Sequence, residues 1–257
     1  MKKKFLIITG LSVVAVTTIA VTAITFANRP PQIAKLESPT QQIESVANNK
    51  KIFDEIRSEA SYSEDPTIPS NLLKGINRHI VKIRVDNIGD AEFLPTTQYY
   101  NNPYNPCTPI TIQITDNLYG DPIQPINNKI YISGGDIKIS KLEESLDETD
   151  IERLGIDTLT ESEKNEEYMR YSSEYSYTME TGKEYIVVVC DIGNGMYKIV
   201  DEGCGIFAVT NPTTRSVNGI VLKNVLTSVE VEQTKLVEDA TELKVDNTVR
   251  NNTNTAK

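Results

Sequence analysis

The sequence predicts a mainly β protein, in which a small closed or partly open β-barrel is interrupted by an acidic helical insertion. Three observations predict this fold class. Five or six short strand candidates are spread over about 135 residues, and turn residues separate them. One long acidic stretch without strand alternation lies between the third and fourth candidates. An apolar segment and a short helical segment precede the first strand.

The N-terminal segment predicts export. Lys2 to Lys4 are followed by an uncharged run of 23 residues, Phe5 to Ala27. A helix rising about 1.5 Å per residue would extend about 34 Å over this run and span a hydrocarbon core about 30 Å thick. The lysines favour the cytoplasmic side, so the remainder is expected outside. Residues 5–27 are a retained single-pass membrane anchor in one interpretation, and in the other a signal peptide that is cleaved after Ala23 or Ala27 to give a secreted protein.

Residues 28–75 are predicted to be a spacer followed by an amphipathic helix. Adjacent Pro30 and Pro31 favour a stiff extended chain. The helix is expected over Ser38 to Ala60, because four apolar residues fall on roughly one helical stripe: Ile43, Val46, Phe53 and Ile56. The stripe packs on the following domain in one interpretation and docks a partner in the other.

Residues 76–226 are predicted to form the barrel domain. The strand candidates are His79 to Val85, Thr108 to Asp116, Asn128 to Ile132, Glu184 to Asp191, Tyr197 to Val200 and Ile206 to Val209. Most of them alternate apolar and polar residues, as half-buried strands do. The run from Glu184 to Asp191 is nearly continuous in apolar residues, which predicts burial on both faces. Gly193-Asn194-Gly195 predicts a hairpin turn.

The acidic insertion covers residues 141–180, and the chain ends in a polar tail. Eleven acidic residues lie between Glu143 and Glu167, so we expect an exposed segment with one or two short helices. Gly155 lacks the alternating oxygen ligands of a calcium loop, so no metal site is predicted. Residues 227–257 are polar and charged and are predicted to be a disordered tail.

Charge and composition exclude several classes of function. Without Lys2 to Lys4, 23 basic and 36 acidic residues remain, a formal net charge of −13. This charge repels phosphate backbones, so nucleic acid is excluded as an expected partner. His79 is the single histidine, so a zinc site with several histidines is impossible. A catalytic triad would have to use His79, and no serine or cysteine motif supports one. We expect no cofactor and no catalytic residue.

The three cysteines leave two interpretations open. Cys190 and Cys204 lie at the ends of neighbouring strand candidates, where a disulfide is conceivable in an exported chain. Two buried thiols that behave as apolar side chains are the alternative. Because the count is odd, at least one thiol, with Cys107 included, stays free or pairs outside the chain.

The order of these pieces resembles a widespread, uncharacterised group of exported proteins in Gram-positive bacteria. The matching pieces are Leu118-Tyr119-Gly120, Ile130 to Gly135, Gly182-Lys183-Glu184-Tyr185 with Ile186 to Val189, Tyr197 to Val200, and Ile206-Phe207. Tyr119 replaces the basic residue usual in the first turn. The resemblance covers Ile80 to Val209 and implies an OB-like barrel. It implies no activity.

Tyrosines suggest where such a barrel binds. Tyr99, Tyr100 and Tyr104 crowd one loop, and aromatic rings on barrel loops stack on ligands. Rings that pad the loop against the barrel are the alternative. The predicted function is an extracytoplasmic, membrane-tethered binding or interaction module with an unknown cell-surface or membrane partner. The alternatives are a hydrolase that uses carboxylates of the insertion, and a structural subunit of a membrane assembly.

Overall fold

The computed structural model describes residues 50–59, 62–102, 104–209 and 220–254, with side chains up to residue 243. The chain divides into two units, Met1–Ile43 and Glu44–Lys257. The first unit, with the predicted anchor and spacer, lies outside the described residues. Within the described part, no helix is both long enough and apolar enough to cross a bilayer.

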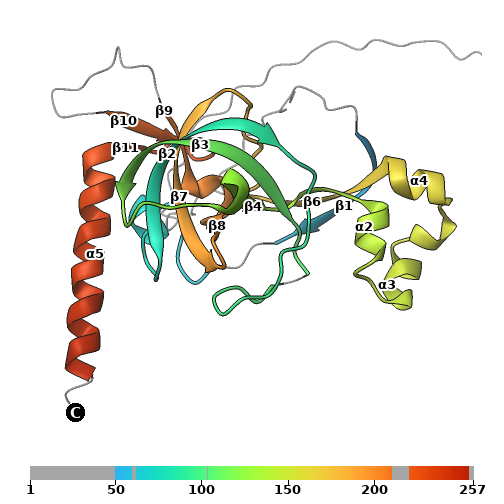
Figure 1. The fold of residues 1–257 in the computed structure, drawn as a ribbon, viewed down its shortest axis with the longest axis horizontal. Coiled ribbons are helices and arrows are strands. Elements are labelled where there is room, and N and C mark those ends of the chain that lie inside the picture. The colour runs from blue at the N-terminus through green and yellow to red at the C-terminus, as the bar shows by residue number, and fades with distance from the viewer. Residues whose placement is uncertain (1–49, 60–61, 103, 210–219, 255–257) are drawn as a thin grey trace, which may run out of the picture. The chain divides into compact units, whose positions relative to one another are not determined.

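Five strands close into a barrel, which confirms the predicted mainly β fold class (Figure 1). They are β2 (Arg78–Ile88), β3 (Cys107–Tyr119), β4 (Lys129–Ser133), β7 (Glu184–Gly193) and β8 (Met196–Ile199). Neighbours follow the order β7-β2-β3-β4-β8, and β8 pairs back onto β7 to complete the ring. All of these pairs are antiparallel except β4 with β8, which run parallel.

Strand β7 is buried on both faces, as its apolar run predicts. Tyr185, Val187 and Val189 point into the barrel core, which contains Ile83, Ile110, Ile130 and Ile199 as well. Ile186 and Val188 point outward into a second apolar cluster with Phe207 and Leu222. Because successive side chains of a strand alternate between faces, only a continuous apolar run satisfies both clusters.

Residues 227–254 contain a strand and a helix, which corrects the disordered tail predicted there; residues 255–257 lie outside the described residues. Beyond β7 the sheet continues through β9 (Ile206–Val209), β10 (Val221–Asn224) and β11 (Glu230–Glu232). Helix α5 (Gln233–Asn254) follows. Its Leu236 and Ala240 are buried in the outer cluster beside Leu72 of α1 (Pro69–Leu72). Two apolar residues four positions apart share one helix face, and that face is sufficient to hold an otherwise polar helix on the sheet.

The acidic insertion forms short helices on a second, three-stranded sheet. The sheet has the order β1-β6-β5, from β1 (Lys51–Ser58), β6 (Glu167–Ser173) and β5 (Gly135–Lys138). The helices are α2 (Ile139–Glu143), α3 (Glu148–Arg153) and α4 (Glu161–Glu166), grouped beyond β1 and β6 at the right of Figure 1. They enclose a small apolar core that includes Ile137, Ile139, Leu142, Ile156 and Met169. The predicted helices are therefore present, but the insertion has its own core.

The helix predicted over Ser38 to Ala60 is wrong where the structure describes it. Residues 51–58 form β1, which pairs in parallel with β6 and has a bulge between Ile52 and Asp54. The extra residue of the bulge shifts which side chains point to each face of the strand, so Phe53 and Ile56 both pack against the core of the insertion. Their three-residue spacing therefore imitates a helical stripe. Ile43 and Val46 lie outside the described residues.

Candidate functional site

A polar cavity of about 320 Å³ lies beside the barrel, at the ends of β1, β4 and β8. Its volume is at the lower end of the range for small-molecule sites. The lining comes from four separate parts of the chain: Ser58, Glu59 and Tyr62; Asn102 and Asn105; Ser133; and Lys198, Asp201 and Glu202. We call this cavity the polar pocket.

A tight turn after β8 aims two carboxylates at the polar pocket. Asp201 and Glu202 both adopt left-handed backbone conformations, with φ of 48° and 54°. Such conformations are uncommon for residues other than glycine, and they cluster at functional sites. A Cβ atom added at Gly205 would lie 2.2 Å from the carbonyl oxygen of Val200, so only glycine fits there. The glycines flanking Cys204 therefore allow close packing, and they leave this thiol 1% exposed.

A buried asparagine holds the same turn from the neighbouring strand. Asn224 of β10 donates from Nδ2 to the carbonyl oxygens of Gly203, Cys204 and Ile206, at 3.3, 2.7 and 3.1 Å. Its Oδ1 accepts hydrogen bonds from the backbone N–H groups of Leu226 and Thr227, each at 3.0 Å. Both polar atoms of this side chain are thus satisfied, and Nδ2 fixes the residues that follow the wall of the polar pocket.

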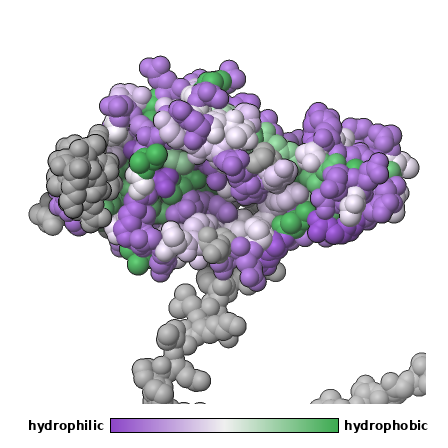
Figure 2. All heavy atoms as spheres, turned by 90° about the horizontal axis from the view of Figure 1, so that it is seen from below, coloured by the Kyte–Doolittle hydropathy of each residue, from purple (hydrophilic) through white to green (hydrophobic). Residues whose placement is uncertain are grey.

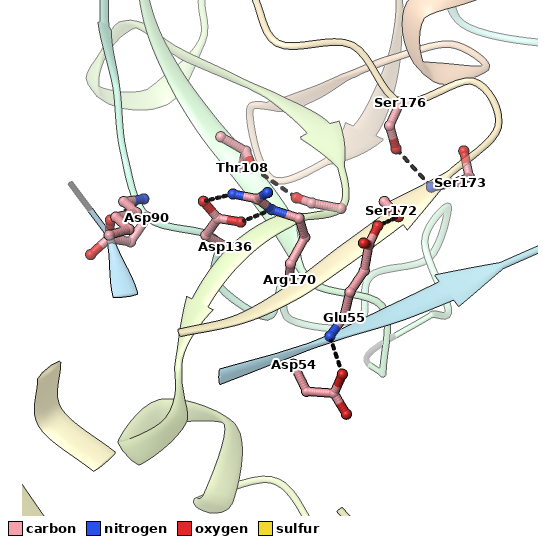
Figure 3. A network of polar contacts seen from close by, with 11 residues as sticks. Asp54, Glu55, Asp90, Thr108, Asp136, Arg170, Ser172, Ser173 and Ser176 are labelled. Atoms are coloured by element: carbon pink, nitrogen blue, oxygen red, sulfur yellow. Dashed lines mark hydrogen bonds and ion pairs between the residues drawn. The ribbon is translucent and has the colours of Figure 1, made fainter. Parts of the chain in front are cut away.

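The carboxylate of Glu202 is tied to the insertion and shifted by burial. Ser173 and Ser176 donate from their hydroxyls to Oε2 of Glu202 at 2.6 and 3.3 Å. Ser176 also accepts from the N–H of Ser173, which fixes the pair after β6 (Figure 3). Burial raises the pKa of Glu202, and the serine hydrogen bonds and Lys198 oppose that shift. Burial raises the pKa of Asp201 as well, against the charges of Arg78 and Lys198.

The second sheet positions the other side of the polar pocket. Arg170 of β6 donates to both carboxylate oxygens of Asp136 on β5, at 2.7 and 3.2 Å. Ser172 donates to Glu55 of β1, and Figure 3 shows both contacts bridging adjacent strands. Ser58 donates to the carbonyl oxygen of Ser172 at 3.3 Å. These cross-strand contacts place the end of β1, with Ser58 and Glu59, at the cavity.

The three predicted tyrosines have different environments. Tyr99 and Tyr104 are exposed, at 50% and 79% of their surfaces. Tyr100 is buried and donates from its hydroxyl to the carbonyl oxygen of Asn102 at 2.8 Å, beside the thiol of Cys107. The ring of Tyr100 therefore packs the loop against the barrel, which is the alternative to ligand binding given above. The same loop supplies Asn102 and Asn105 to the polar pocket.

The conceivable disulfide between Cys190 and Cys204 is not formed. All three cysteines are free thiols, and Cys107 and Cys204 are buried. The Cys190 thiol donates to the carbonyl oxygen of Lys198 at 3.4 Å instead of facing Cys204. Burial and the nearby carboxylates of Asp201 and Glu202 raise the pKa of Cys204 to about 12. Cys107 and Cys204 therefore behave as apolar core groups, as the second interpretation given above has it for Cys204, whereas Cys190 is only half-buried.

His79 and the acidic residues do not assemble a metal site. His79 Nδ1 lies 3.1 Å from the carbonyl oxygen of Asp121, and its ring meets Tyr197 edge to face. In the part of the chain that the structure describes, no cluster of histidine, cysteine and carboxylate side chains is suited to hold a metal ion.

The molecular face shown in Figure 2 is mostly hydrophilic, and its hydrophobic side chains form small separate groups.

Sequence reasoning missed the charged residues of the polar pocket. Lys198 reads as an ordinary polar position of an alternating strand, and Asp201 and Glu202 read as turn residues. Adjacent acidic residues followed by Gly203 and Gly205 were the available signal for a tight acidic turn. No protein-family model and no curated protein matches the chain.

Proposed function

We propose that this protein is an extracytoplasmic binding module, tethered to the membrane through residues 5–27, with an OB-like barrel as its folded core. The uncharged N-terminal run after Lys2 to Lys4 supports export. The barrel order β2-β3-β4-β8-β7, with its parallel β4–β8 pair and an insertion between β4 and β7, supports the OB-like assignment. The ligand is a component of the cell surface.

The observation that carries the proposal is the β2–β3 loop. In OB barrels the loop between the first two strands is a usual ligand-binding element. Here this loop presents two exposed rings, Tyr99 and Tyr104, and directs Asn102 and Asn105 to the polar pocket. Exposed aromatic rings beside hydrogen-bonding amides are suited to stack on and orient a polar ligand.

A carboxylate-dependent hydrolase is less well supported by the geometry, because the carboxylates that line the polar pocket, Glu59, Asp201 and Glu202, come from outside the acidic insertion that was expected to supply them. Acid–base catalysis by two carboxylates requires pKa values that the site moves apart. Burial raises the pKa of Asp201 and of Glu202 in the same direction. In addition, Oε2 of Glu202 is occupied by two serine hydroxyls. This pair is better suited to hold a positively charged group than to exchange protons with a substrate.

A docking role for the predicted stripe is less well supported too. Phe53 and Ile56 belong to the packing of the insertion core and are not presented to a partner. A structural subunit would therefore need a different contact surface. The binding module remains the function that the exposed loop and the polar pocket favour.

Export of the folded domain is tested in cells that express the full chain with a C-terminal tag. After removal of the wall, added protease should digest the folded domain together with a known surface protein. Mass analysis of the purified protein then distinguishes a retained anchor from a cleaved signal peptide. Protection of the domain, while the surface protein is digested, contradicts export.

Binding is tested by sedimentation of the full chain with purified cell walls. The double variant Tyr99→Ser/Tyr104→Ser should weaken binding about tenfold, equivalent to about 1.4 kcal/mol. The matched control is Ile76→Ser/Ile126→Ser, which removes two exposed apolar side chains outside the loop. An equal effect of the two double variants, or no binding by the wild-type chain, contradicts the proposed function.

A further inference from the structure

The polar pocket carries charges of both signs, and among the described residues these charges make no direct ion pair with each other. Lys198 lines it from β8, and Glu59, Asp201 and Glu202 line it as carboxylates. Within the described residues, neither Lys198 nor Asp201 forms an ion pair. The nearest aromatic contact of the Lys198 ammonium is the ring of Tyr100, whose centroid is 6.0 Å away. The positive charge of Lys198 acts on Asp201 through space, and both side chains line the cavity, where a ligand can contact them directly.

We propose that the polar pocket binds a small zwitterion, a molecule with an ammonium group at one end and a carboxylate at the other, such as a short peptide with free termini. This inference rests on the proposed binding function and names its ligand class. The ammonium lies against Asp201 and the carboxylate lies against Lys198. A ligand with one charge would exclude water from the opposite charge of the pocket without giving that charge a direct partner, which costs free energy. A zwitterion satisfies both ends.

The neutral lining fits the middle of such a ligand. Ser133, Asn102 and Asn105 offer hydroxyl and amide groups that both donate and accept hydrogen bonds. The hydroxyl of Ser58 already donates to Ser172 and offers an acceptor. A peptide bond presents one donor and one acceptor, which these groups match. Tyr62 adds an aromatic wall, and its ring is fixed by an edge-to-face contact with Tyr175 at 5.4 Å. The volume of about 320 Å³ accommodates a dipeptide.

The backbone holds the anionic end in place before any ligand arrives. Asn224 bonds the carbonyl groups of Gly203, Cys204 and Ile206, which directly follow the two left-handed residues Asp201 and Glu202. Ser173 and Ser176 restrain Glu202. A preorganised carboxylate loses little conformational freedom when it binds an ammonium group, so the site gains affinity.

The experiment compares three probes of nearly equal size by titration calorimetry with the full chain. Alanyl-alanine carries both charges, N-acetyl-alanyl-alanine only the carboxylate, and alanyl-alanine amide only the ammonium. We expect alanyl-alanine to bind about tenfold more tightly than either capped form, because each cap removes one ion pair, worth about 1.4 kcal/mol.

Two variants test which residue of the pocket binds each charged end of the dipeptide. Lys198→Met should abolish the preference for alanyl-alanine over its amide and keep the preference over the N-acetyl form. Asp201→Asn should do the reverse, and asparagine suits the left-handed backbone, so the turn stays folded. Lys223→Met removes an exposed lysine of β10 outside the pocket lining and should change neither preference. Thermal unfolding verifies that each variant is folded.

Three outcomes overturn the inference: alanyl-alanine binds no more tightly than the capped probes, Lys198→Met and Asp201→Asn weaken all three probes equally, or no probe binds. Sedimentation with cell walls separates these failures from failure of the proposed function. If the wild-type chain binds walls through Tyr99 and Tyr104 but ignores the dipeptide, the module stands and the zwitterion assignment is wrong. If neither binds, both proposals fail.

Discussion

The side chain of Asn224 donates a hydrogen bond of 2.7 Å to the carbonyl oxygen of Cys204, across the gap between β10 and the turn that walls the polar pocket. Two further carbonyl groups of the turn accept from the same nitrogen. The side chain is 4% exposed, so water cannot replace these bonds when it is removed. Asn224 therefore links the stability of the fold to the shape of the site.

Replacement of Asn224 should destabilise the protein. We expect Asn224→Ala to lower the free energy of unfolding by about 2–3 kcal/mol, because buried carbonyl groups lose their donors. Urea denaturation measures the change. Asn165→Ala is the matched control, since the amide of Asn165 donates to the carbonyl oxygen of Glu161 at 2.7 Å in an exposed place. A cost for Asn224→Ala no larger than that of the control would contradict this role.

The C-terminal helix should contribute to folding stability through Leu236. This side chain is fully buried among Leu72, Ile80 and Phe207. Leu236→Ala should lower the free energy of unfolding by about 2–4 kcal/mol, as buried leucines do when a cavity replaces them. Glu242→Ala, on the exposed side of the same helix, should stay within about 0.5 kcal/mol of wild type. Equal effects would mean that α5 does not pack on the sheet.

The strands of the barrel could be predicted from sequence because their signal is local. Alternation and turn residues define β2, β3, β4 and β7 closely, and the two-faced burial of β7 follows from its continuous apolar run. Interior and outer clusters both require particular residue types at period two. This alternation can be read from each strand alone, without knowing which strands pair with each other.

The second sheet and the site depend on contacts that sequence pattern does not report. Strand β1 pairs with β6, which lies more than a hundred residues further along the chain, and its bulge hides the strand periodicity. The polar pocket gathers residues from Ser58 to Glu202. Asp201 and Glu202 line the pocket from a turn in which both residues have positive φ values. Tertiary packing imposes this backbone conformation. Gly203 and Gly205 indicate a turn after these residues, but they do not indicate the left-handed conformation of Asp201 and Glu202.

The cysteines should differ in reactivity in the folded state. Because the pKa of Cys204 is raised to about 12 and its side chain is buried, iodoacetamide at pH of about 8 should leave it unmodified. Cys190, which is partly exposed, should react first. In urea without reductant all three thiols should be labelled, as mass spectrometry of tryptic peptides would show. Labelling of Cys107 alone in urea would instead reveal a disulfide between Cys190 and Cys204.

Glu202 should make stability depend on pH in a defined direction. Burial raises the pKa of its carboxyl above the ordinary value of 4.5, so the folded protein keeps this proton to a higher pH than the unfolded chain. Between the two pKa values the native state binds more protons, and the free energy of unfolding falls as pH rises. The stabilising contribution is present below the unfolded pKa and is lost as pH rises through the folded pKa.

The variant Glu202→Gln removes this dependence and keeps an oxygen for the hydroxyls of Ser173 and Ser176. The Tm of the variant, relative to wild type, should therefore increase as pH rises from about 4 to about 7. Thermal unfolding followed by circular dichroism gives both values at each pH. Glu230→Gln, at an exposed position of β11, should give a difference that changes little over the same range. If the Glu202→Gln difference is flat or declines with pH, the buried carboxylate does not titrate as its surroundings require, and the pocket wall is more open to water than its packing indicates.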